Sequence, residues 1–440
     1  MGGRLRPGSP ASLEQSAGSP ASERLMRMKP RQIILIAQWF PPEQAPIGFM
    51  IRELANDLAG AGWDVTVVTG FPNHPTGIVF GGYRKRWLLE EYVEGVRVWR
   101  VNLYTSRRRT PLRRVLTFLS FTISSCLMIA LRARPDVVFA VLQPLSVGVT
   151  LPMLKWLKGF RLVLNVQDLH PDVPIQLGLV RNPLLIRVLH AVERFAYRHA
   201  DRLAVICDGF RRHCIERGAR KEAVRVIPNW VDLDEIRPGA PRTAFRASIG
   251  LGEDHFVVLY AGTIGYVSGA EVMVEVARVL GKDSRIRVVF VGEGPLTSLL
   301  ERAVKNANLE NVIFVPFQPR DRLNDVQAAA DISVVTLLPG KGKLSVPSKV
   351  LGYMAAARCV ACAVDADSET AHLVSEARCG VVTAPGDPDA LAGAILALKA
   401  DGSRRDEMAR NGRAYLERHL SRHTVTRQYI SLFDDALANP

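Results

Sequence analysis

Short apolar runs rich in β-branched residues alternate with amphipathic stretches along the first half of the chain. Such runs are typical of strands buried on both faces, and the stretches between them have helical spacing. The strand candidates are residues 33–37, 65–69, 96–101, 137–141, 162–166, 203–206 and 224–227, and helix candidates include 50–59, 184–199 and 209–217. This alternation predicts parallel β-α-β units.

A segment rich in proline and glycine interrupts the pattern. It contains Pro-Asn-Trp-Val-Asp at 228–232 and Pro-Gly-Ala-Pro at 238–241, a composition typical of a domain boundary. The alternation then resumes, with strand candidates at 257–261, 288–291, 312–315, 332–335, 360–363 and 380–383 and helix candidates at 270–280, 296–307, 323–330 and 349–356. Asp387 followed by Pro388 marks the start of a further helix, and residues 401–436 have an amphipathic helical pattern.

The whole pattern predicts an α/β protein of two Rossmann-like domains that face each other across a cleft. Ligands of open α/β sheets bind at the carboxyl ends of the strands, so the loops of both domains should point toward that cleft. We expect a disordered tail at 1–29, an N-terminal domain at 30–235, a linker at 236–242, a second domain at 243–400, and C-terminal helices at 401–440 that pack back on the N-terminal domain.

Charge and cysteine content narrow the function classes. The 440 residues carry a net charge of +14, which favours an anionic partner such as a nucleic acid, a membrane surface or a phosphorylated substrate. The first 28 residues are rich in Ser, Gly, Ala and Pro and have no apolar core, so they do not resemble a signal peptide. The 6 cysteines are therefore expected to be reduced thiols of a cytosolic protein.

The positive charge is concentrated before an apolar run. Arg107, Arg108, Arg109, Arg113 and Arg114 precede residues 115–131, which are mostly apolar but contain three serines and two threonines. This run is shorter than the roughly 20 residues that span a bilayer. A buried core helix, a helix lying on a membrane and a true span remain alternatives. The arginines favour membrane contact over 107–131, because they are attracted to anionic headgroups.

Two glycine turns follow strand candidates in the second half. Gly262, Thr263 and Gly265 follow one strand, and Gly292, Glu293 and Gly294 follow another. Glycine lets a backbone approach a ligand closely, and the start of the next helix attracts negative charge. These six residues are candidates for binding an anionic nucleotide. The alternative is that the glycines only serve the packing of helix against sheet.

A third candidate element opens the helix near residue 349. Ser345, Pro347, Ser348 and Lys349 precede or begin this helix, with further lysines at 341 and 343. Hydroxyl groups, free N–H groups of the first turn and a lysine are suited to a phosphate. An ordinary capped helix with a solvated lysine is the alternative.

In the first half, polar residues follow three strand candidates. Asp168 and His170 follow residues 162–166, where they could move a proton or bind a sugar hydroxyl. The alternative is ordinary turn chemistry, since Asp and Pro commonly build turns. Glu43 follows the first strand, and Asn73 and His74 follow the second, so these loops should share one edge of the sheet.

Other chemistries receive less support. Cys359 and Cys362 could form a zinc site with His372 and Cys379. However, residues three apart on a strand point to opposite faces, so we expect neither zinc nor disulfide chemistry there. The chain has no HExxH, Walker loop or G-x-S-x-G motif. The first strand-to-helix turn has only Gly48 in place of G-x-G-x-x-G, which argues against a nicotinamide enzyme.

In this order and spacing, the motifs resemble the retaining glycosyltransferase family 4 of GT-B fold, especially the branch of colanic-acid-type fucosyltransferases and N-acetylfucosaminyl transferases. The similarity extends from Ile33 to Leu432. It is carried by Phe-Pro-Pro-Glu at 40–43, Gly-Phe-Pro-Asn-His-Pro-Thr-Gly at 70–77, Gln-Asp-Leu-His-Pro at 167–171, Val-Ile-Pro-Asn-Trp-Val-Asp at 226–232, Tyr-Ala-Gly-Thr-Ile-Gly at 260–265, Val-Gly-Glu-Gly-Pro at 291–295, Val-Pro-Ser-Lys at 346–349 and Gly-Tyr-Met-Ala at 352–355.

The resemblance implies a nucleotide-sugar donor on the C-terminal domain and an acceptor on the N-terminal domain, where Glu43, Gly48, Asn73 and His74 are the candidates. Transfer with retention would need no metal or other cofactor. The implied acceptor is a polyprenyl-diphosphate-linked saccharide, met by a cytoplasmic protein bound peripherally to the inner face of the cytoplasmic membrane.

The chain departs from the family at two places. Most members have Glu-x7-Glu, where this chain has Leu344 and Gly352, and the usual Arg and Lys after the Gly262 turn are replaced by residues 266–268. Ser348 and Lys349 are the expected substitutes, because a diphosphate needs charge and donors. A catalytically inactive subunit that binds a glycan or a partner transferase is therefore the second hypothesis. A nucleic-acid binder is third, because the sequence contains no recognised nucleic-acid module.

Overall fold

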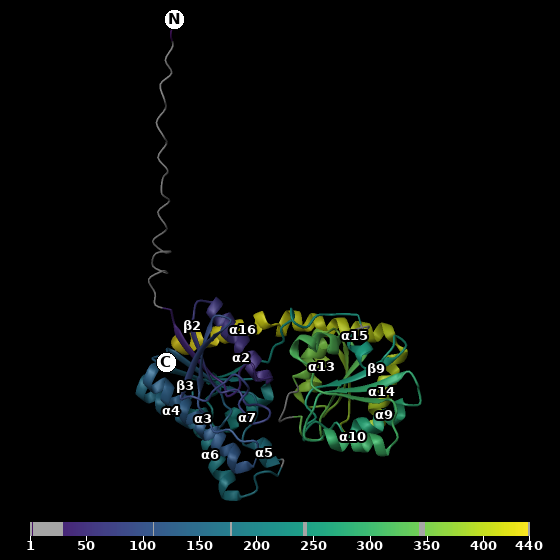
Figure 1. Ribbon diagram of the computed structural model, residues 1–440, viewed down its shortest axis with the longest axis horizontal. Coiled ribbons are helices and arrows are strands. Elements are labelled where there is room, and N and C mark those ends of the chain that lie inside the picture. The colour runs from purple at the N-terminus through teal and green to yellow at the C-terminus, as the bar shows by residue number, and fades with distance from the viewer. Residues whose placement is uncertain are drawn as a thin grey trace.

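The computed structural model describes residues 2, 30–108, 110–176, 178–240, 244–342 and 348–438. It forms two lobes, each built around one sheet, and the C-terminal helices run along both lobes (Figure 1). The tail predicted at 1–29 lies outside the described residues apart from Gly2.

The N-terminal lobe contains an eight-stranded sheet in the order β3-β4-β2-β1-β5-β6-β7-β8. Its strands are β1 (Gln32–Ile36), β2 (Asp64–Gly70), β3 (Leu88–Val93), β4 (Val96–Val101), β5 (Val137–Val141), β6 (Arg161–Val166), β7 (Arg202–Val205) and β8 (Val224–Val226). All neighbours pair in parallel except β3, which is antiparallel to β4. The apolar runs predicted seven of these strands. Edge strand β3 was not predicted, because Glu90 and Glu91 break its apolar pattern.

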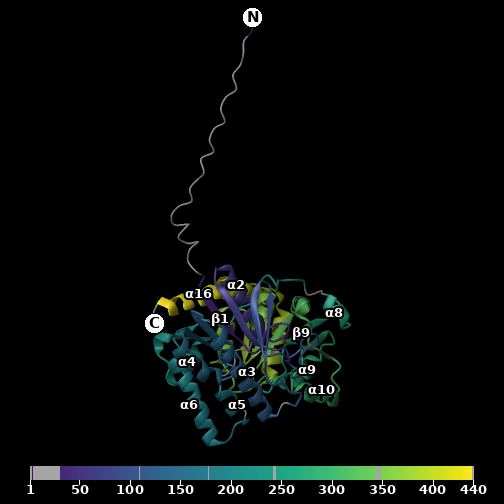
Figure 2. The ribbon, with the colours of Figure 1, turned by 60° about the vertical axis from the view of Figure 1, so that its left-hand side comes forward.

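Helices cover both faces of this sheet. They are α2 (Pro46–Gly60), α3 (Pro111–Arg132), α4 (Val147–Lys158), α5 (Asp172–Gln176), α6 (Pro183–His199) and α7 (Asp208–Glu216). Alternate residues of β1 enter opposite cores: Leu35 packs in the core that α2 contributes to, and Ile36 packs in the core beneath α3, α4 and α6. Figure 2 shows α3, α4 and α6 together in the lower part of the lobe.

The C-terminal lobe contains a fully parallel six-stranded sheet in the order β11-β10-β9-β12-β13-β14. Its strands are β9 (Phe256–Ala261), β10 (Ile286–Val291), β11 (Val312–Val315), β12 (Ile332–Thr336), β13 (Cys359–Ala363) and β14 (Gly380–Thr383). The helical elements of the lobe are α8 (Ala244–Ser248), α9 (Val272–Leu280), α10 (Thr297–Asn306), η2 (Arg320–Arg322), α11 (Leu323–Ala328), α12 (Lys349–Ala355), α13 (Glu369–Glu376) and α14 (Pro388–Ala400). The expected α/β class with two Rossmann-like lobes is confirmed.

The C-terminal segment crosses from one lobe to the other. Helix α15 (Gly402–Tyr415) packs on α12 and α14, a single π-helical turn follows at Leu416–Leu420, and α16 (Arg422–Ala438) packs on α2 and β6. The hydroxyl of Tyr429 on α16 accepts a hydrogen bond of 2.9 Å from Nδ2 of Asn165 in β6. A parallel β-bridge between Val231 and Ser421 joins the C-terminal segment to the residues shortly before the linker. The segment therefore belongs to both lobes.

Helix α3 contains the apolar run preceded by arginines. Of the helices in the described ranges, α3 alone is long and apolar enough to span a membrane by length and composition, and a third of its most apolar window is buried. The side chains of Phe121, Met128 and Ile129 on this helix pack into the core of the lobe. Other side chains along the same helix are exposed. The helix is thus a layer of the folded lobe with one apolar face inward and another outward.

Candidate functional site

The two glycine turns of the C-terminal lobe lie against each other. They follow neighbouring strands β9 and β10, and the backbone N–H of Gly262 donates to the carbonyl of Val291 at 2.8 Å. A Cβ on Gly292 would lie 2.2 Å from the carbonyl oxygen of Gly262, and one on Gly294 would lie 2.2 Å from that of Ile264. Gly292 and Gly294 are therefore required by the contact between the two turns. The packing role of these glycines is thus between turn and turn.

The remaining predicted residues of these turns lie on the outside. Thr263 and Glu293 are exposed and Gly265 is half-buried. A Cβ on Gly265 would meet nothing nearer than 3.8 Å, the Cγ2 of Thr263. These three residues are the part of the double turn with space for a ligand.

Lys349 lies beside the Gly262 turn. It begins α12, which follows β12, and β12 is the neighbour of β9 where the strand order reverses. Its Nζ lies 3.6 Å from the ring centroid of Tyr260, and its Cε lies 3.4 Å from the position of a Cβ on Gly262. Burial lowers the pKa of Lys349 to about 7. The reversal point is where ligands bind in such sheets, so this ammonium is placed for an anionic ligand.

Ser348 lies next to Lys349 and is exposed. Its hydroxyl makes no capping hydrogen bond to α12. The other two residues predicted here, Ser345 and Pro347, lie in the segment 343–347 outside the described ranges, as does Leu344.

In the N-terminal lobe, Asp168 and His170 lie directly after β6, and both side chains are half-buried. The backbone N–H of His170 donates to the carbonyl of Asp168 at 3.0 Å. Burial raises the pKa of Asp168 against the opposing charge of His170, and burial lowers the pKa of His170. The Nε2 atom of His170 is buried and has no hydrogen-bond partner in the part of the chain described. The pair is thus biased toward its neutral forms, and one ring nitrogen is available.

A buried ionic cluster that the sequence did not indicate supports this loop. Glu193 of α6 is fully buried and accepts hydrogen bonds from His213 at 2.8 Å and His190 at 3.2 Å. Burial opposes its ionisation, but these two bonds hold the pKa of Glu193 below its usual range. Asp172, two residues after His170, lies 3.7 Å from both histidines and 3.4 Å from Arg217. The cluster therefore fixes α5 and the end of the Asp168–His170 loop on α6 and α7.

Three of the four predicted acceptor residues hold loops together. Oε1 of the fully buried Glu43 accepts hydrogen bonds from the backbone N–H of Asn73 and of His74, both at 2.8 Å. A Cβ on Gly48 would lie 3.1 Å from the Cα of Phe40, so Gly48 allows α2 to approach the same loop. Asn73 is buried and donates to the carbonyl of Phe71.

The four predicted acceptor residues differ in their exposure. Glu43, Gly48 and Asn73 are directed inward and build the edge, whereas His74 is half-exposed. The ring of His74 lies 4.9 Å from that of Trp39, centroid to centroid. His74 is the member of the set that the structure leaves placed to meet a ligand.

The lobes touch at this edge. The backbone N–H of Gly209, at the start of α7, donates to Oε1 of Glu369 at the start of α13 at 2.8 Å. Nζ of Lys341 lies 3.5 Å from Oε1 of Gln176 in α5. The carboxyl-end loops of the two sheets therefore approach each other.

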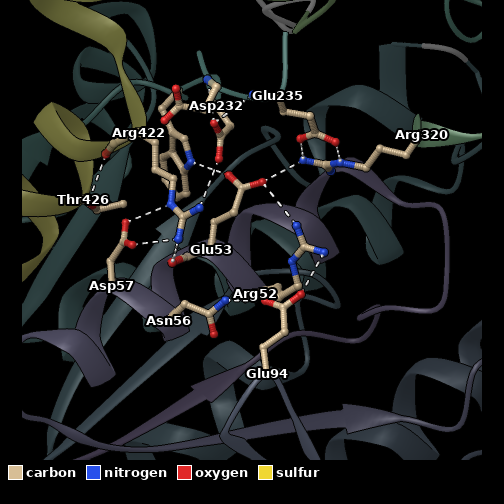
Figure 3. A network of polar contacts seen from close by, with 12 residues as sticks. Arg52, Glu53, Asn56, Asp57, Glu94, Asp232, Glu235, Arg320, Arg422 and Thr426 are labelled. Atoms are coloured by element: carbon tan, nitrogen blue, oxygen red, sulfur yellow. Dashed lines mark hydrogen bonds and ion pairs between the residues drawn. The ribbon is translucent and has the colours of Figure 1, made fainter. Parts of the chain in front are cut away.

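A second junction between the lobes is a network of polar contacts (Figure 3). Glu53 of α2 is buried, with Oε2 accepting from Nε1 of Trp230 at 2.8 Å and Oε1 pairing with Arg320 at 2.7 Å. Arg320 comes from η2 of the C-terminal lobe and also pairs with Glu235, the residue directly before the linker. Burial raises the pKa of Glu53, opposed by these partners.

Helix α16 reaches the same junction. Arg422 pairs with Asp57 of α2 at 2.7 Å and with Asp232, shortly before the linker, at 3.1 Å. Helix α2, the segment before the linker, η2 and α16 are thus joined by one network. The residues are far apart in sequence, and each resembles an ordinary surface charge when taken alone, which is why sequence analysis did not identify them.

The positions of the cysteines and of the possible metal ligands among the described residues bear on metal and thiol chemistry. Cys359 and Cys362 pack in cores on opposite faces of the sheet. Within the described ranges, no three His, Cys, Asp or Glu side chains are arranged to hold a metal ion.

The fold of the chain matches that of several solved structures. Sucrose-phosphate synthase from Thermosynechococcus elongatus superposes with a TM-score of 0.74 at 19% identity, covering 93% of this chain and 100% of that one. Anabaena Alr3699/HepE, solved in complex with UDP-glucose, gives a TM-score of 0.68 at 17% identity, covering 92% and 99%. At this identity the likeness shows the fold alone, which is the GT-B arrangement of two Rossmann-like lobes.

Sequence comparison gives the family. The family described as "Glycosyl transferase 4-like domain" matches residues 47–230, and "Glycosyl transferases group 1" matches 241–415. WcaI of Escherichia coli (strain K12), named as a colanic acid biosynthesis glycosyl transferase, is 29% identical over 89% of this chain and 97% of its own. WbjE of Pseudomonas aeruginosa, named as a glycosyltransferase, is 27% identical over 59% and 65%. The chain belongs to the family 4 type of GT-B glycosyltransferases, with relatives in surface-polysaccharide biosynthesis.

Proposed function

We propose that the protein transfers a sugar, with retention of configuration, from a nucleotide-sugar donor to a polyprenyl-diphosphate-linked saccharide during surface-polysaccharide assembly. The observation that carries the proposal is Lys349, an ammonium beside the Gly262 turn at the reversal point of the C-terminal sheet. The named role of WcaI in colanic acid biosynthesis supports the polysaccharide context. The UDP-glucose complex of HepE supports a nucleotide-sugar donor.

In the proposed reaction, Lys349, Ser348 and the outer face of the double turn bind the donor diphosphate. The bond from the sugar carbon to the diphosphate oxygen breaks, and a bond to the acceptor oxygen forms on the same face. The departing diphosphate takes the proton of the acceptor hydroxyl, while Lys349 stabilises its charge. Asp168 and His170 orient the acceptor or the sugar through hydrogen bonds. No step requires a metal.

The proposal includes a location. The protein is cytoplasmic and bound peripherally at the inner face of the cytoplasmic membrane, where the lipid-linked acceptor lies. Helix α3 supports this, because it combines a buried face with exposed apolar side chains and follows an arginine-rich segment. Arg109 of that segment lies outside the described residues.

Two measurements test the function. A thermal-shift screen of nucleoside diphosphates should identify the base, because a ligand that binds only the native state raises the unfolding temperature. Membranes containing the protein should then transfer radiolabel from the matching nucleotide sugar to a lipid extract. Absence of a thermal shift with every nucleotide would contradict the proposal.

A second candidate function rests on Gly352, which stands where most family members have a glutamate. The space of its missing side chain faces the amide of Gln327, whose Nε2 would lie 3.2 Å from a Cβ at residue 352. A catalytically inactive subunit would show the thermal shift and bind its partner without transferring sugar. Nucleotide binding without transfer to any lipid acceptor would favour this candidate.

A further inference from the structure

Exposed apolar side chains concentrate on three helices of the N-terminal lobe. More than half of the large apolar side chains that are exposed in the described ranges lie on α3, α4 and α6. Ile123 of α3 is 60% exposed, Trp156 and Leu157 of α4 are 67% and 82% exposed, and Leu184 of α6 is 66% exposed. Scattered single cases would need no explanation, but a cluster marks an interaction surface.

The three helices form one continuous face. Helix α4 contacts α3 on one side and α6 on the other, and the three lie together at the lower left of Figure 1. Their inner sides are committed to the core through Phe121, Leu151 and Tyr197. The outward apolar side chains therefore do not belong to the core of this chain. We call the outer surface of α3, α4 and α6 the three-helix face.

The charges of the three-helix face have one sign. Helices α3 and α4 contain no Asp or Glu, and the acidic residue of α6, Glu193, is fully buried. The exposed charged side chains of the face include Arg114, Arg132, Arg187, Arg194 and Arg198. Apolar side chains surrounded by arginines complement an anionic lipid surface, where the apolar groups enter the acyl boundary and the arginines meet the headgroups.

We propose that the three-helix face docks on an anionic bilayer, inserting Trp156, Leu157 and Leu184 at the interface. The proposal rests on the proposed membrane location and extends it from α3 to α4 and α6. An exposed tryptophan suits this position, because its ring prefers the headgroup level. A helix that packs in the core on one side lies along the membrane and does not cross it.

Docking on this face would bring the catalytic loop to the lipid. The loop with Asp168 and His170 is fixed on α6 through Asp172 and His190, which approach within 3.7 Å. The edge of the lobe that carries these residues would then lie near the headgroups. An acceptor anchored in the bilayer could reach it without leaving the membrane.

Vesicle co-sedimentation of the full chain tests the proposal. The probes are phosphatidylcholine vesicles with and without phosphatidylglycerol. Leu157→Ser/Leu184→Ser changes only exposed positions of the face. The matched control is Leu299→Ser/Leu396→Ser, on exposed positions of α10 and α14 in the other lobe. Circular dichroism and thermal unfolding confirm that each variant folds.

We expect the wild-type chain and the control to sediment with the anionic vesicles, and the face variant to bind at least about tenfold more weakly, since each leucine loses its apolar burial. Arg187→Gln/Arg194→Gln/Arg198→Gln should weaken binding to the anionic vesicles at low salt and reduce its salt dependence. Equal binding by the face variant and the control would overturn the proposal. So would a wild-type dimer that the face variant dissociates, because the face would then bind protein.

The outcome is separable from the proposed function. Transfer to a soluble saccharide acceptor, measured without vesicles, should be unchanged in the face variant. If no chain transfers sugar but the wild type still binds anionic vesicles, the proposed function fails and the docking face stands. If transfer proceeds and vesicle binding is absent, the docking face is wrong.

Discussion

Glu43 in the N-terminal lobe and Lys349 in the C-terminal lobe are charged side chains at the carboxyl edges whose pKa values burial shifts toward the neutral form, and the surroundings of these two side chains are opposite. Burial raises the pKa of Glu43 in the N-terminal lobe, but its oxygens accept from three backbone N–H groups, those of Phe40, Asn73 and His74. Burial lowers the pKa of Lys349 in the C-terminal lobe to about 7, and its neighbour is the ring face of Tyr260.

This difference distinguishes a charged side chain that stabilises the fold from one that is placed to bind a ligand. A buried charge is costly unless it is paired or hydrogen-bonded. Glu43 is satisfied by the protein itself, and its removal should harm the fold. Among the described residues, the ammonium of Lys349 has no ion-pair partner and lies over the ring of Tyr260, so an anionic ligand could compensate its charge. Its removal should harm binding and leave the fold intact.

The largest expected effect belongs to Asp168, which should act in neither of these two ways. Asp168→Asn keeps the shape of the side chain and removes its charge and basicity. We expect turnover to fall by at least about 10²-fold, the scale of losing a group that orients a reactant, with nucleotide affinity nearly unchanged because Asp168 lies on the other lobe. Single-turnover kinetics and nucleotide titration measure the two quantities. A collapse of nucleotide affinity would place Asp168 in the donor site instead.

Glu43→Ala should destabilise the fold by about 3 kcal/mol, because it leaves buried N–H groups without their acceptor. Chemical denaturation gives the change in the free energy of unfolding. Glu43→Gln, which retains one acceptor oxygen, should lose less. If Glu43→Ala unfolds like the wild type but loses acceptor affinity, the expectation of a direct acceptor contact is correct and the comparison with Lys349 fails.

The elements that could be predicted from the sequence are those fixed by neighbouring residues along the chain. Apolar runs such as Val137–Val141 predicted strands because a parallel strand must be apolar on both faces. The Asp387 cap was also predictable, and its side chain accepts from the N–H of Ala390 at 2.9 Å. Edge strand β3 was missed because one side of it faces solvent.

The candidate site was only partly predictable, because it depends on contacts between residues that are far apart in the sequence. The sequence singled out Gly292 and Gly294, but only the structure shows that they serve contact between two turns. Glu53 and Arg320 are 267 positions apart, and no pattern in the sequence joins them. The sequence predicted membrane contact over 107–131, but it did not show which side chains of α3 face outward, because apolar side chains on the core side and on the outer side look alike in sequence.

Lys349→Met should weaken binding of a nucleoside diphosphate by about 1.5–3 kcal/mol, the scale of a hydrogen bond to a charged group. Methionine preserves the length of the side chain and removes only the charge, so the free energy of unfolding should not fall. Calorimetric titration compares the diphosphate with the free nucleoside, whose affinity should change little. Equal losses for both ligands would argue against a role at the diphosphate.

The smallest expected effect is the pH dependence of donor binding. Because the pKa of Lys349 is about 7, roughly half of the free enzyme carries the charged ammonium at pH 7 and about a tenth carries it at pH 8. An anionic diphosphate favours the charged form and raises this pKa, so binding takes up a proton. Affinity for a nucleotide sugar, which has no titrating phosphate in this range, should therefore fall about fivefold from pH 7 to pH 8.

Titrations in buffers of different ionisation enthalpy measure the proton uptake directly. The slope and the uptake should both be absent in Lys349→Met. A wild-type affinity that is flat across this range would mean that the diphosphate is held by other groups and that Lys349, like Glu43, serves the fold.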